Sequence, residues 1–219
     1  MPAQPELLIF DLDGTLIDSR LDLAEAVNAT RQHMGKEPLA NERVYSYVGN
    51  GAPVLIRRAM GDQATEAELQ EALEYFMEYY GDHDLDYTTL YPGVKESLDR
   101  LLAAQKRMAV LTNKPVRMSR SIVKGLGVAD HFVQVYGGNS FEFKKPNPIG
   151  IEALMRETGI DRARTMMIGD SSVDVHTARN AGVQCCGVTY GFQPETLADP
   201  APELVVDRME DLANWVLAR

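Results

Sequence analysis

Residues 7–19 read LLIFDLDGTLIDS, and this stretch decides how the rest of the chain is interpreted. The four apolar residues Leu7–Phe10 predict a short buried strand. The strand runs directly into Asp11, and Asp13 follows two positions later. In an extended turn, side chains two positions apart point to the same side. We therefore expect both carboxyl groups to face one site at the end of this strand.

The composition of the chain is that of an ordinary globular protein, with 219 residues, of which 45% are hydrophobic and 25% are charged. This length suits one core domain with a small insertion. A net charge of −10 argues against nucleic acid or an anionic membrane as a partner, because such binders carry a basic face. No apolar run approaches the length that spans a bilayer.

The amino-terminal segment lacks the pattern of a signal peptide, and the two cysteines are the adjacent residues Cys185 and Cys186. Neighbouring cysteines seldom have the geometry for a disulfide. They lie in an apolar run, which favours packed free thiols in a reducing compartment. We therefore expect a cytoplasmic protein.

Two regions with different patterns follow the first strand. Residues 17–87 are predicted to be mostly helical, with helices from Asp18 to about His33, over 41–48 and 52–60, and from Glu66 to about Tyr80, stopped by Gly81. Thr65-x-x-Glu68 has the form of a capping box at the start of the last of these helices. About 70 helical residues far exceed an ordinary connection, so they predict an inserted domain.

From residue 88 onward, helices alternate with short apolar strands. We expect strands at 108–112, 132–136, 165–168, 184–189 and 204–206, and helices at 94–105, 115–126, 148–158, 174–181 and 209–218. This alternation predicts an α/β fold, a doubly wound parallel sheet with helices on both faces. The predicted domains are an α/β core of residues 1–16 and 88–219 and a helical domain of residues 17–87. An insertion at the ligand-binding edge of the sheet could act as a lid.

Polar residues follow three of the predicted strands. Thr112-Asn113-Lys114 and Gly169-Asp170 come at strand ends, Asp174 follows closely, and Lys144-Lys145 lies between them in the sequence. In parallel sheets, such strand ends form the ligand-binding edge. Four carboxylates gathered there stay ionised only beside cations, and Mg²⁺ with its oxygen ligands answers that need. A lysine and a threonine hydroxyl would then hold phosphoryl oxygens.

The motifs DLDGT at 11–15, Thr112-Asn113, Lys145-Pro146 and GDSSVD at 169–174 resemble, in order, the four motifs of the haloacid dehalogenase-like (HAD) hydrolase superfamily. The resemblance covers essentially the whole chain. It implies a Rossmann-like core with a helical cap inserted after the first strand, and an Mg²⁺-dependent activity on a small phosphorylated metabolite. Members that remove halide lack an acid at the position of Asp13, so its presence here points to phosphoryl transfer.

The resemblance also implies a role for each motif residue. Asp11 resembles the nucleophile that forms an aspartyl-phosphate, and Asp13 the general acid and base. The other implied contacts are a metal site of Asp11, the backbone carbonyl of Asp13, Asp170 and Asp174, and a phosphoryl site of Thr112, the Asn113 amide and Lys145, with Gly14 letting the chain turn away.

Simpler roles compete with some of these. Asp13 alone could be a turn residue, and Asp170 or Asp174 could be an acid at the amino end of a helix, stabilised there by the helix dipole. Either Lys144 or Lys145 could serve, and we choose Lys145 because it directly precedes proline, as the family's lysine commonly does.

The identity of the leaving group depends on other segments. VGNGAP at 48–53, KKPNP at 144–148 and GVTYGF at 187–192 are similar to phosphoglycolate phosphatases, which implies 2-phosphoglycolate as substrate. Arg57 is our hypothesis for a clamp on its carboxylate, and a solvated helix arginine is the alternative. Another small phosphomonoester or pyrophosphate, a phosphosugar mutase, and an inert HAD-fold binding module stay open. The sequence does not predict an oligomeric state.

Overall fold

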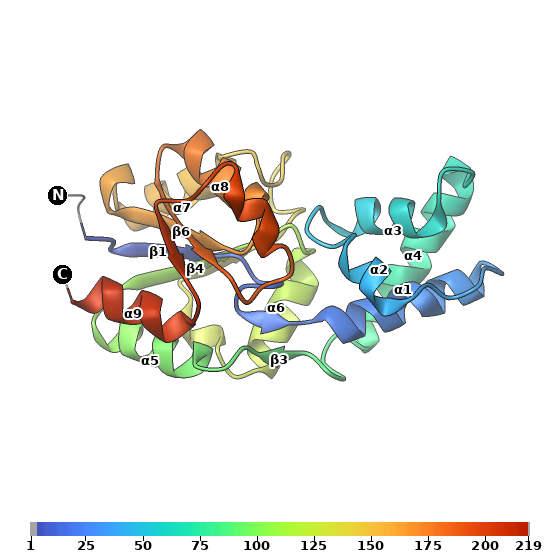
Figure 1. Ribbon diagram of the computed structural model, residues 1–219, viewed down its shortest axis with the longest axis horizontal. Helices are drawn as coiled ribbons and strands as arrows, with labels where there is room; N and C mark the ends of the chain where they lie inside the picture. Colours follow the sequence, from blue (N-terminus) through green and yellow to red (C-terminus); the bar gives the residue numbers. More distant parts are fainter. Residues whose placement is uncertain (1–3, 219) are drawn as a thin grey trace. The chain divides into compact units, whose positions relative to one another are not determined.

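The computed structural model describes residues 4–218, and the chain forms two units (Figure 1). One unit combines the chain up to Ile17 with the chain from Leu90 onward, and the other is Asp18–Thr89. The boundaries predicted from the sequence lie after residues 16 and 87. Where the chain passes between the units, the short strands β2 (Ile17–Asp18) and β3 (Thr89–Leu90) pair with each other.

The first unit is built on a six-stranded sheet, which confirms the predicted doubly wound α/β fold. The strand order is β5-β4-β1-β6-β7-β8, and every described pairing between neighbours is parallel. The strands are β1 (Leu7–Phe10), β4 (Arg107–Leu111), β5 (Gln134–Tyr136), β6 (Thr165–Gly169), β7 (Gln184–Val188) and β8 (Leu204–Val206). The first strand in the sequence therefore lies inside the sheet, between β4 and β6.

Helices cover both faces of this sheet (Figure 1). They are α5 (Val94–Ala103), α6 (Val116–Gly125) and α9 (Met209–Leu217) on one face, and α7 (Ile149–Thr158) and α8 (Ser172–Ala181) on the other. The side chains of β1 alternate between the two cores: Leu8 and Phe10 join the first, Leu7 and Ile9 the second. Burial on both faces explains why this strand is apolar at every position. Short 3₁₀ helices lie at Ala129–His131, Arg162–Arg164 and Pro194–Ala198.

The second unit is helical, as predicted. It contains α1 (Arg20–His33), α2 (Asn41–Tyr45), α3 (Ala52–Met60) and α4 (Glu66–Asp82). The predicted capping box is confirmed, because the Thr65 hydroxyl accepts a hydrogen bond from the Glu68 amide while the Glu68 carboxylate accepts one from the Thr65 amide.

Three predicted helix ends in this unit were wrong. Asp18 belongs to β2 and accepts a hydrogen bond from the Arg20 amide, so α1 begins two residues later than expected. The helix predicted for 41–48 ends at Tyr45. Gly81 does not stop α4, because its backbone stays outside the left-handed region and the helix continues to Asp82.

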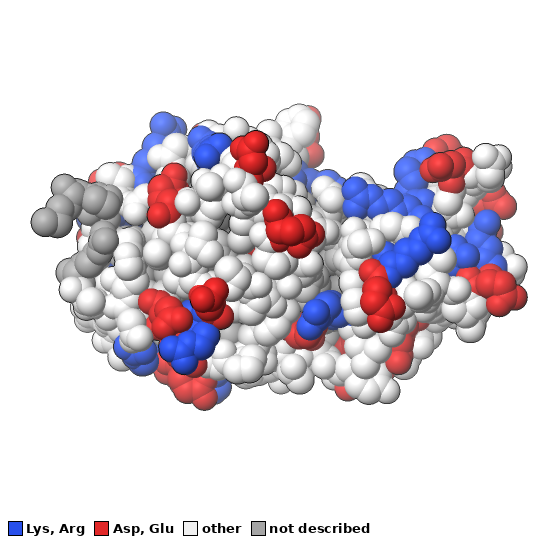
Figure 2. Space-filling view, viewed as in Figure 1, with Lys and Arg blue, Asp and Glu red and all other residues white. Residues whose placement is uncertain are grey.

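Charged side chains of both signs are spread over the face of the α/β unit drawn in Figure 2, where the described residues form no continuous basic area. This agrees with the net charge of −10. None of the helices described between residues 4 and 218 is long and apolar enough to cross a membrane.

Candidate active site

The register of the sheet brings three strand ends to one level. Phe10 pairs with Val110 of β4 on one side and with Ile168 of β6 on the other. The Asp11 amide continues the ladder by donating to the Ile168 carbonyl at 2.8 Å. Asp11, Thr112 and Asp170 therefore follow three adjacent strands at the same edge. The sequence explains the place of Asp11: the four apolar residues form the buried strand, and the acid that follows them comes where the strand ends.

A buried lysine holds two of the carboxylates together. The Lys145 ammonium lies 2.9 Å from Asp11 Oδ1 and 2.7 Å from Asp174 Oδ1, and all three side chains are buried. Burial by itself lowers the pKa of Lys145, but the two carboxylates outweigh this and raise its pKa above the usual value. Lys145 is therefore a permanent cation at the centre of the site. Lys144, the neighbour considered for the same role, is only partly buried.

Asp170 is held from another direction. Its Oδ2 accepts hydrogen bonds from the backbone amides of Phe192 at 2.6 Å and of Gln193 at 3.3 Å. The segment 187–192 is similar in sequence to phosphoglycolate phosphatases, but its contact with Asp170 was not predicted. Two N–H groups after β7 thus fix the position of a carboxylate that follows β6.

Glycines allow the carboxylates to approach the backbone. Gly14 has φ +82, and a Cβ there would lie 2.3 Å from Asp170 Oδ2. At Gly169, a Cβ would lie 2.1 Å from the carboxyl carbon of Asp174. Any larger side chain at either position would displace a carboxylate of the cluster, so both glycines are part of the construction of the site.

Asp174 serves the helix and the site together. Its Oδ2 accepts from the Ser171 amide at 3.2 Å and from the Ser171 hydroxyl at 2.9 Å, which completes a capping box at the start of α8. Its Oδ1 accepts from Lys145. The role of a helix-terminal acid and the role of a site carboxylate are therefore combined in one side chain.

The cluster of carboxylates fits a divalent cation. Asp11, Asp170 and Asp174 each offer an oxygen, and these three oxygens lie within 4.8 Å of one another. One ammonium group, that of Lys145, faces this cluster directly within the described chain, and it leaves negative charge uncompensated. Hard carboxylate oxygens at this spacing suit a small divalent cation such as Mg²⁺.

Burial and mutual repulsion raise the pKa values of two of these carboxyl groups. Burial, followed by the charges of Asp174 and Asp11, raises the pKa of Asp170 to about 8. Burial also raises the pKa of Asp11 to about 6, because the opposing effect of Lys145 is smaller. Without a further cation, the site therefore favours a proton on Asp170 near neutral pH.

Asp13 has a cation of its own, which the sequence analysis did not assign. The Lys114 ammonium lies 2.9 Å from Asp13 Oδ1 and 3.3 Å from Oδ2. Lys114 is buried, and the Asp13 carboxylate is largely buried. The signal was present in the sequence, because Lys114 directly follows the Thr-Asn pair, but spacing alone did not reveal its partner.

The Thr112-Asn113 pair is tied to the neighbouring segments. Thr112 Oγ1 accepts a hydrogen bond from the Lys114 amide at 3.2 Å, and Asn113 Nδ2 donates to the Lys145 carbonyl at 3.2 Å. Both side chains are buried. These bonds join the segment after β4 to the loop that carries Lys145.

Arg57 lies in the helical unit, on α3. Its two terminal nitrogens donate to the two oxygens of Glu66 at 2.9 and 3.0 Å, and both side chains are exposed. Its guanidinium group thus already has a carboxylate partner within the helical unit.

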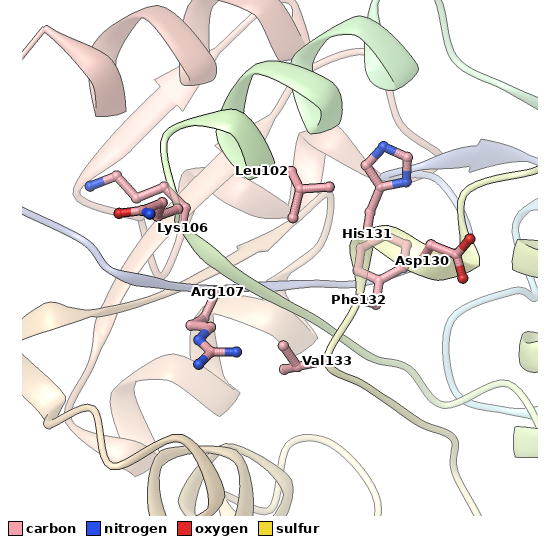
Figure 3. Close-up of a pocket in the computed structure, with 8 residues that line it drawn as sticks. Leu102, Lys106, Arg107, Asp130, His131, Phe132 and Val133 are labelled. Atoms are coloured by element: carbon pink, nitrogen blue, oxygen red, sulfur yellow. The ribbon is translucent and has the colours of Figure 1, made fainter.

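One cavity of the α/β unit lies away from this cluster of residues. It has a volume of about 670 Å³ and is lined by Leu102, Arg107, His131 and Val133, among others (Figure 3). Arg107 begins β4, whereas Thr112 follows its other end. The His131 Nε2 atom is paired with Asp99 at 2.6 Å. This cavity therefore lies at the amino end of the sheet and takes no part in the carboxylate site.

The chemistry of the carboxylate site can be stated from its parts. Asp11 is a buried carboxylate next to a fixed ammonium, Asp13 is a second carboxylate at the same strand end, and three acids can share a divalent cation. A carboxylate nucleophile, a second carboxyl group for proton transfer and cations that offset phosphoryl charge form one set of groups that can transfer a phosphoryl group.

Comparison with known proteins identifies similar chains. Residues 8–188 match the family model described as haloacid dehalogenase-like hydrolase. A phosphoglycolate phosphatase of Pseudomonas fluorescens is 40% identical over 219 residues, covering 96% of this chain and 80% of the relative. One of Vibrio parahaemolyticus is 40% identical over 218 residues, covering 96% of both chains. A crystal structure of a predicted phosphoglycolate phosphatase from Haemophilus somnus superposes with a TM-score of 0.92 at 32% identity, covering 97% of this chain and 98% of that one.

The raised pKa values predict how stability depends on pH and metal. In unfolding, Asp11 and Asp170 return to their ordinary pKa of 3.8 from values of about 6 and about 8. The folded metal-free protein binds more protons than the unfolded chain in this interval, so its stability falls as pH rises from about 4 to about 8. Thermal unfolding should therefore show that added Mg²⁺ raises Tm more at about pH 8.5 than at about pH 5.

The control for this prediction is Asp170→Asn, which removes one of the three carboxyl groups that could hold the cation and a buried titratable group. In chelator, this variant should lose less stability than the wild type between the two pH values, and its Tm should respond little to Mg²⁺. An equal Mg²⁺-dependent shift of Tm at both pH values in the wild type would contradict the prediction.

Proposed function

The chain belongs to the haloacid dehalogenase-like hydrolase family, and on that premise we propose that it is an Mg²⁺-dependent phosphatase that converts 2-phosphoglycolate to glycolate and inorganic phosphate. One observation supports this class of reaction. Asp11 and Asp13 lie at the end of one strand, beside the Lys145 ammonium and a cluster of three carboxyl groups that could hold a cation. The substrate rests on the relatives, whose names specify phosphoglycolate and whose identity reaches 40%.

In the first step, an oxygen of Asp11 attacks phosphorus. Asp11 Oδ1 accepts hydrogen bonds from the Leu12 amide at 2.7 Å and from Lys145, so Oδ2 is the oxygen that we expect to form the new bond. The bond between phosphorus and the ester oxygen breaks, and the protonated Asp13 carboxyl group gives its proton to the leaving alkoxide. Glycolate departs, and the phosphoryl group stays on Asp11 as an aspartyl-phosphate.

In the second step, water returns the enzyme to its starting state. The Asp13 carboxylate takes a proton from the water molecule, whose oxygen attacks phosphorus. The bond between phosphorus and Asp11 breaks, inorganic phosphate leaves, and both aspartates regain their initial form. The same carboxyl group thus acts as an acid in the first step and, having lost its proton, as a base in the second.

The residues around the phosphoryl group bind and orient it. The Thr112 hydroxyl and the Asn113 amide would donate to phosphoryl oxygens, and Lys145 would neutralise charge between Asp11 and the phosphate. Gly14 keeps the backbone clear of Asp170. Asp11, Asp170, Asp174 and the backbone carbonyl of Asp13 would hold Mg²⁺, which supplies positive charge to the phosphoryl oxygens when it is bound.

Arg57 remains our proposal for a cap residue that binds the substrate carboxylate. Its bidentate pairing with Glu66 matches the geometry with which arginine binds a carboxylate in general. An exposed ion pair is worth little, so a substrate carboxylate could replace Glu66 at small cost.

We propose a cytoplasmic location, and a small phosphorylated metabolite as partner rather than nucleic acid or a membrane. The two cysteines are free and buried, and burial raises the pKa of both thiols. Buried free thiols are consistent with the proposed reducing compartment. Fractionation of cells that express the full chain would test the location.

Substitution of the two aspartates tests the proposed mechanism. Asp11→Asn removes the nucleophile and should abolish Mg²⁺-dependent phosphate release, a loss of more than about 10³-fold. Asp13→Asn should lower kcat with 2-phosphoglycolate by about 10²- to 10⁴-fold, because no acid protonates the alkoxide. With p-nitrophenyl phosphate, whose leaving group needs no proton, the same variant should release one equivalent of nitrophenolate and accumulate phosphorylated enzyme, visible by mass spectrometry.

The wild-type enzyme in chelator serves as the control, and phosphate release should return when Mg²⁺ is restored. Full activity of Asp11→Asn would contradict the covalent mechanism. Absence of phosphate release from the wild type with every small phosphomonoester would favour the inert binding module instead.

Substitution of Arg57 tests the carboxylate clamp. Arg57→Ala should lower kcat/KM for 2-phosphoglycolate by about 10-fold or more through KM, because one charge-assisted hydrogen-bond pair is lost. The same variant should hydrolyse p-nitrophenyl phosphate nearly as well as the wild type.

Arg58→Ala is the matched control, since Arg58 is the next residue on α3, is exposed, and donates only to the Tyr47 carbonyl in the described contacts. Glu66→Gln should lower the KM for 2-phosphoglycolate by weakening the competing pair. Equal losses of Arg57→Ala on both substrates, or losses on neither, would rule out the clamp.

A further inference from the structure

We propose that Lys114 is a specificity-determining residue whose ammonium group binds the negatively charged substituent of the leaving group, next to the ester oxygen. The inference deepens the proposed function and rests on it, because it names the core residue that distinguishes a phosphorylated carboxylic acid from a phosphomonoester whose leaving group is uncharged. The proposal begins from a buried lysine that the phosphoryl chemistry described above does not use.

The two buried lysines of the site face different groups. Lys145 lies between Asp11 and Asp174, on the side where the phosphoryl group binds. Lys114 lies against Asp13, within 2.9 Å of Oδ1 and 3.3 Å of Oδ2. Asp13 must reach the ester oxygen of the leaving group in order to protonate it. Lys114 is therefore the lysine placed on the leaving-group side.

The backbone around Lys114 is held tightly. Its amide donates to Thr112 Oγ1 at 3.2 Å, and its carbonyl accepts from the Gly138 amide at 2.9 Å. A Cβ at Gly138 would lie 2.4 Å from the Asn113 carbonyl oxygen, so glycine is needed for the loop after β5 to reach this position. The side chain is 3% exposed and its ammonium contacts both oxygens of Asp13, so its charge has a defined place, which is what recognition of one substituent requires.

The position of the ammonium fits a carboxylate adjacent to the ester. In 2-phosphoglycolate, the carboxylate carbon is bonded to the carbon that carries the ester oxygen. A group that contacts Asp13, which itself contacts the ester oxygen, therefore lies within reach of that carboxylate. The contact between a buried ammonium and a carboxylate is a strong, charge-assisted hydrogen bond.

Binding of a substrate carboxylate by Lys114 would also change the contacts of Asp13. Both oxygens of Asp13 face the Lys114 ammonium, whereas protonation of the leaving group requires one of them at the ester oxygen. A substrate carboxylate that takes over the ammonium releases an oxygen of Asp13 toward the ester. A substrate without negative charge at this place leaves the pair intact. Binding of the correct leaving group would thereby also prepare the residue that acts on it.

The experiment compares two alkyl phosphates that differ in this charge. Initial rates with 2-phosphoglycolate and with ethyl phosphate should be measured for the wild type, Lys114→Met, Lys114→Gln and Lys114→Arg. In the Met and Gln variants we expect kcat/KM for 2-phosphoglycolate to fall about 10- to 100-fold further than kcat/KM for ethyl phosphate, with a clear rise in KM. Lys114→Arg should retain most of the preference, because it keeps a cationic donor.

Lys124→Met is the matched control, since Lys124 is an exposed lysine of the same unit, on α6. Thermal unfolding shows whether each variant is folded, and Lys114→Arg keeps the test valid if the neutral variants are not. Equal losses on the two substrates would mean that Lys114 only positions Asp13, and unchanged rates on both would mean that it has no role. Either result overturns the proposal while the substrate assignment stands.

Failure of the proposed function has a different signature. If the wild type itself hydrolyses ethyl phosphate as efficiently as 2-phosphoglycolate, the substrate assignment is wrong, and the carboxylate contact of Lys114 is overturned with it.

Discussion

The rest of the site depends on the contact of the Lys145 ammonium with Asp11 and Asp174. Buried carboxylates that lie close together repel each other, and each would be costly to ionise alone. Lys145 offsets part of this cost for two of them and fixes the distance between the end of β1 and the start of α8. It does not compensate Asp170, whose pKa stays raised. The chain therefore builds a site that is incomplete without a further cation, which is a common way to bind a metal ion with few protein ligands.

The fold makes this contact possible through the order of its strands. β1 lies between β4 and β6, so that the ends of three strands distant in the sequence meet beside one another. Close approach then depends on small residues: Gly14 and Gly169 leave room for Asp170 and Asp174 against the backbone. The register of the sheet brings the segments to one edge, and the glycines determine how near their carboxylates can come.

Much of this arrangement could be predicted from the sequence, and the reason is physical. The apolar run Leu7–Phe10 and the alternation of helices with short strands predict a parallel sheet, and the strand ends follow from it. The capping box at Thr65 was predicted because its signal is local. Contacts between segments with no pattern of their own were missed: Lys114 with Asp13, and Asp170 with the amides of Phe192 and Gln193. Helix ends such as Asp18 were wrong where pairing of β2 with β3 outweighed helical spacing.

The balance of charge around the site bears on which substrates it accepts. Four carboxylates, those of Asp11, Asp13, Asp170 and Asp174, face the two ammonium groups of Lys114 and Lys145 among the described contacts. A single divalent cation would balance the remaining charge. A protein with a net charge of −10 could then admit an anionic substrate, because the local field of the site is no longer repulsive. The distribution of the positive charge matters as much as its total: in the proposed mechanism, the metal site and Lys145 would lie where the phosphoryl group reacts, and Lys114 would lie beside the group that leaves. A substrate with negative charge at both ends matches this distribution better than a phosphomonoester with charge at one end, which is a physical reason to expect a phosphorylated acid.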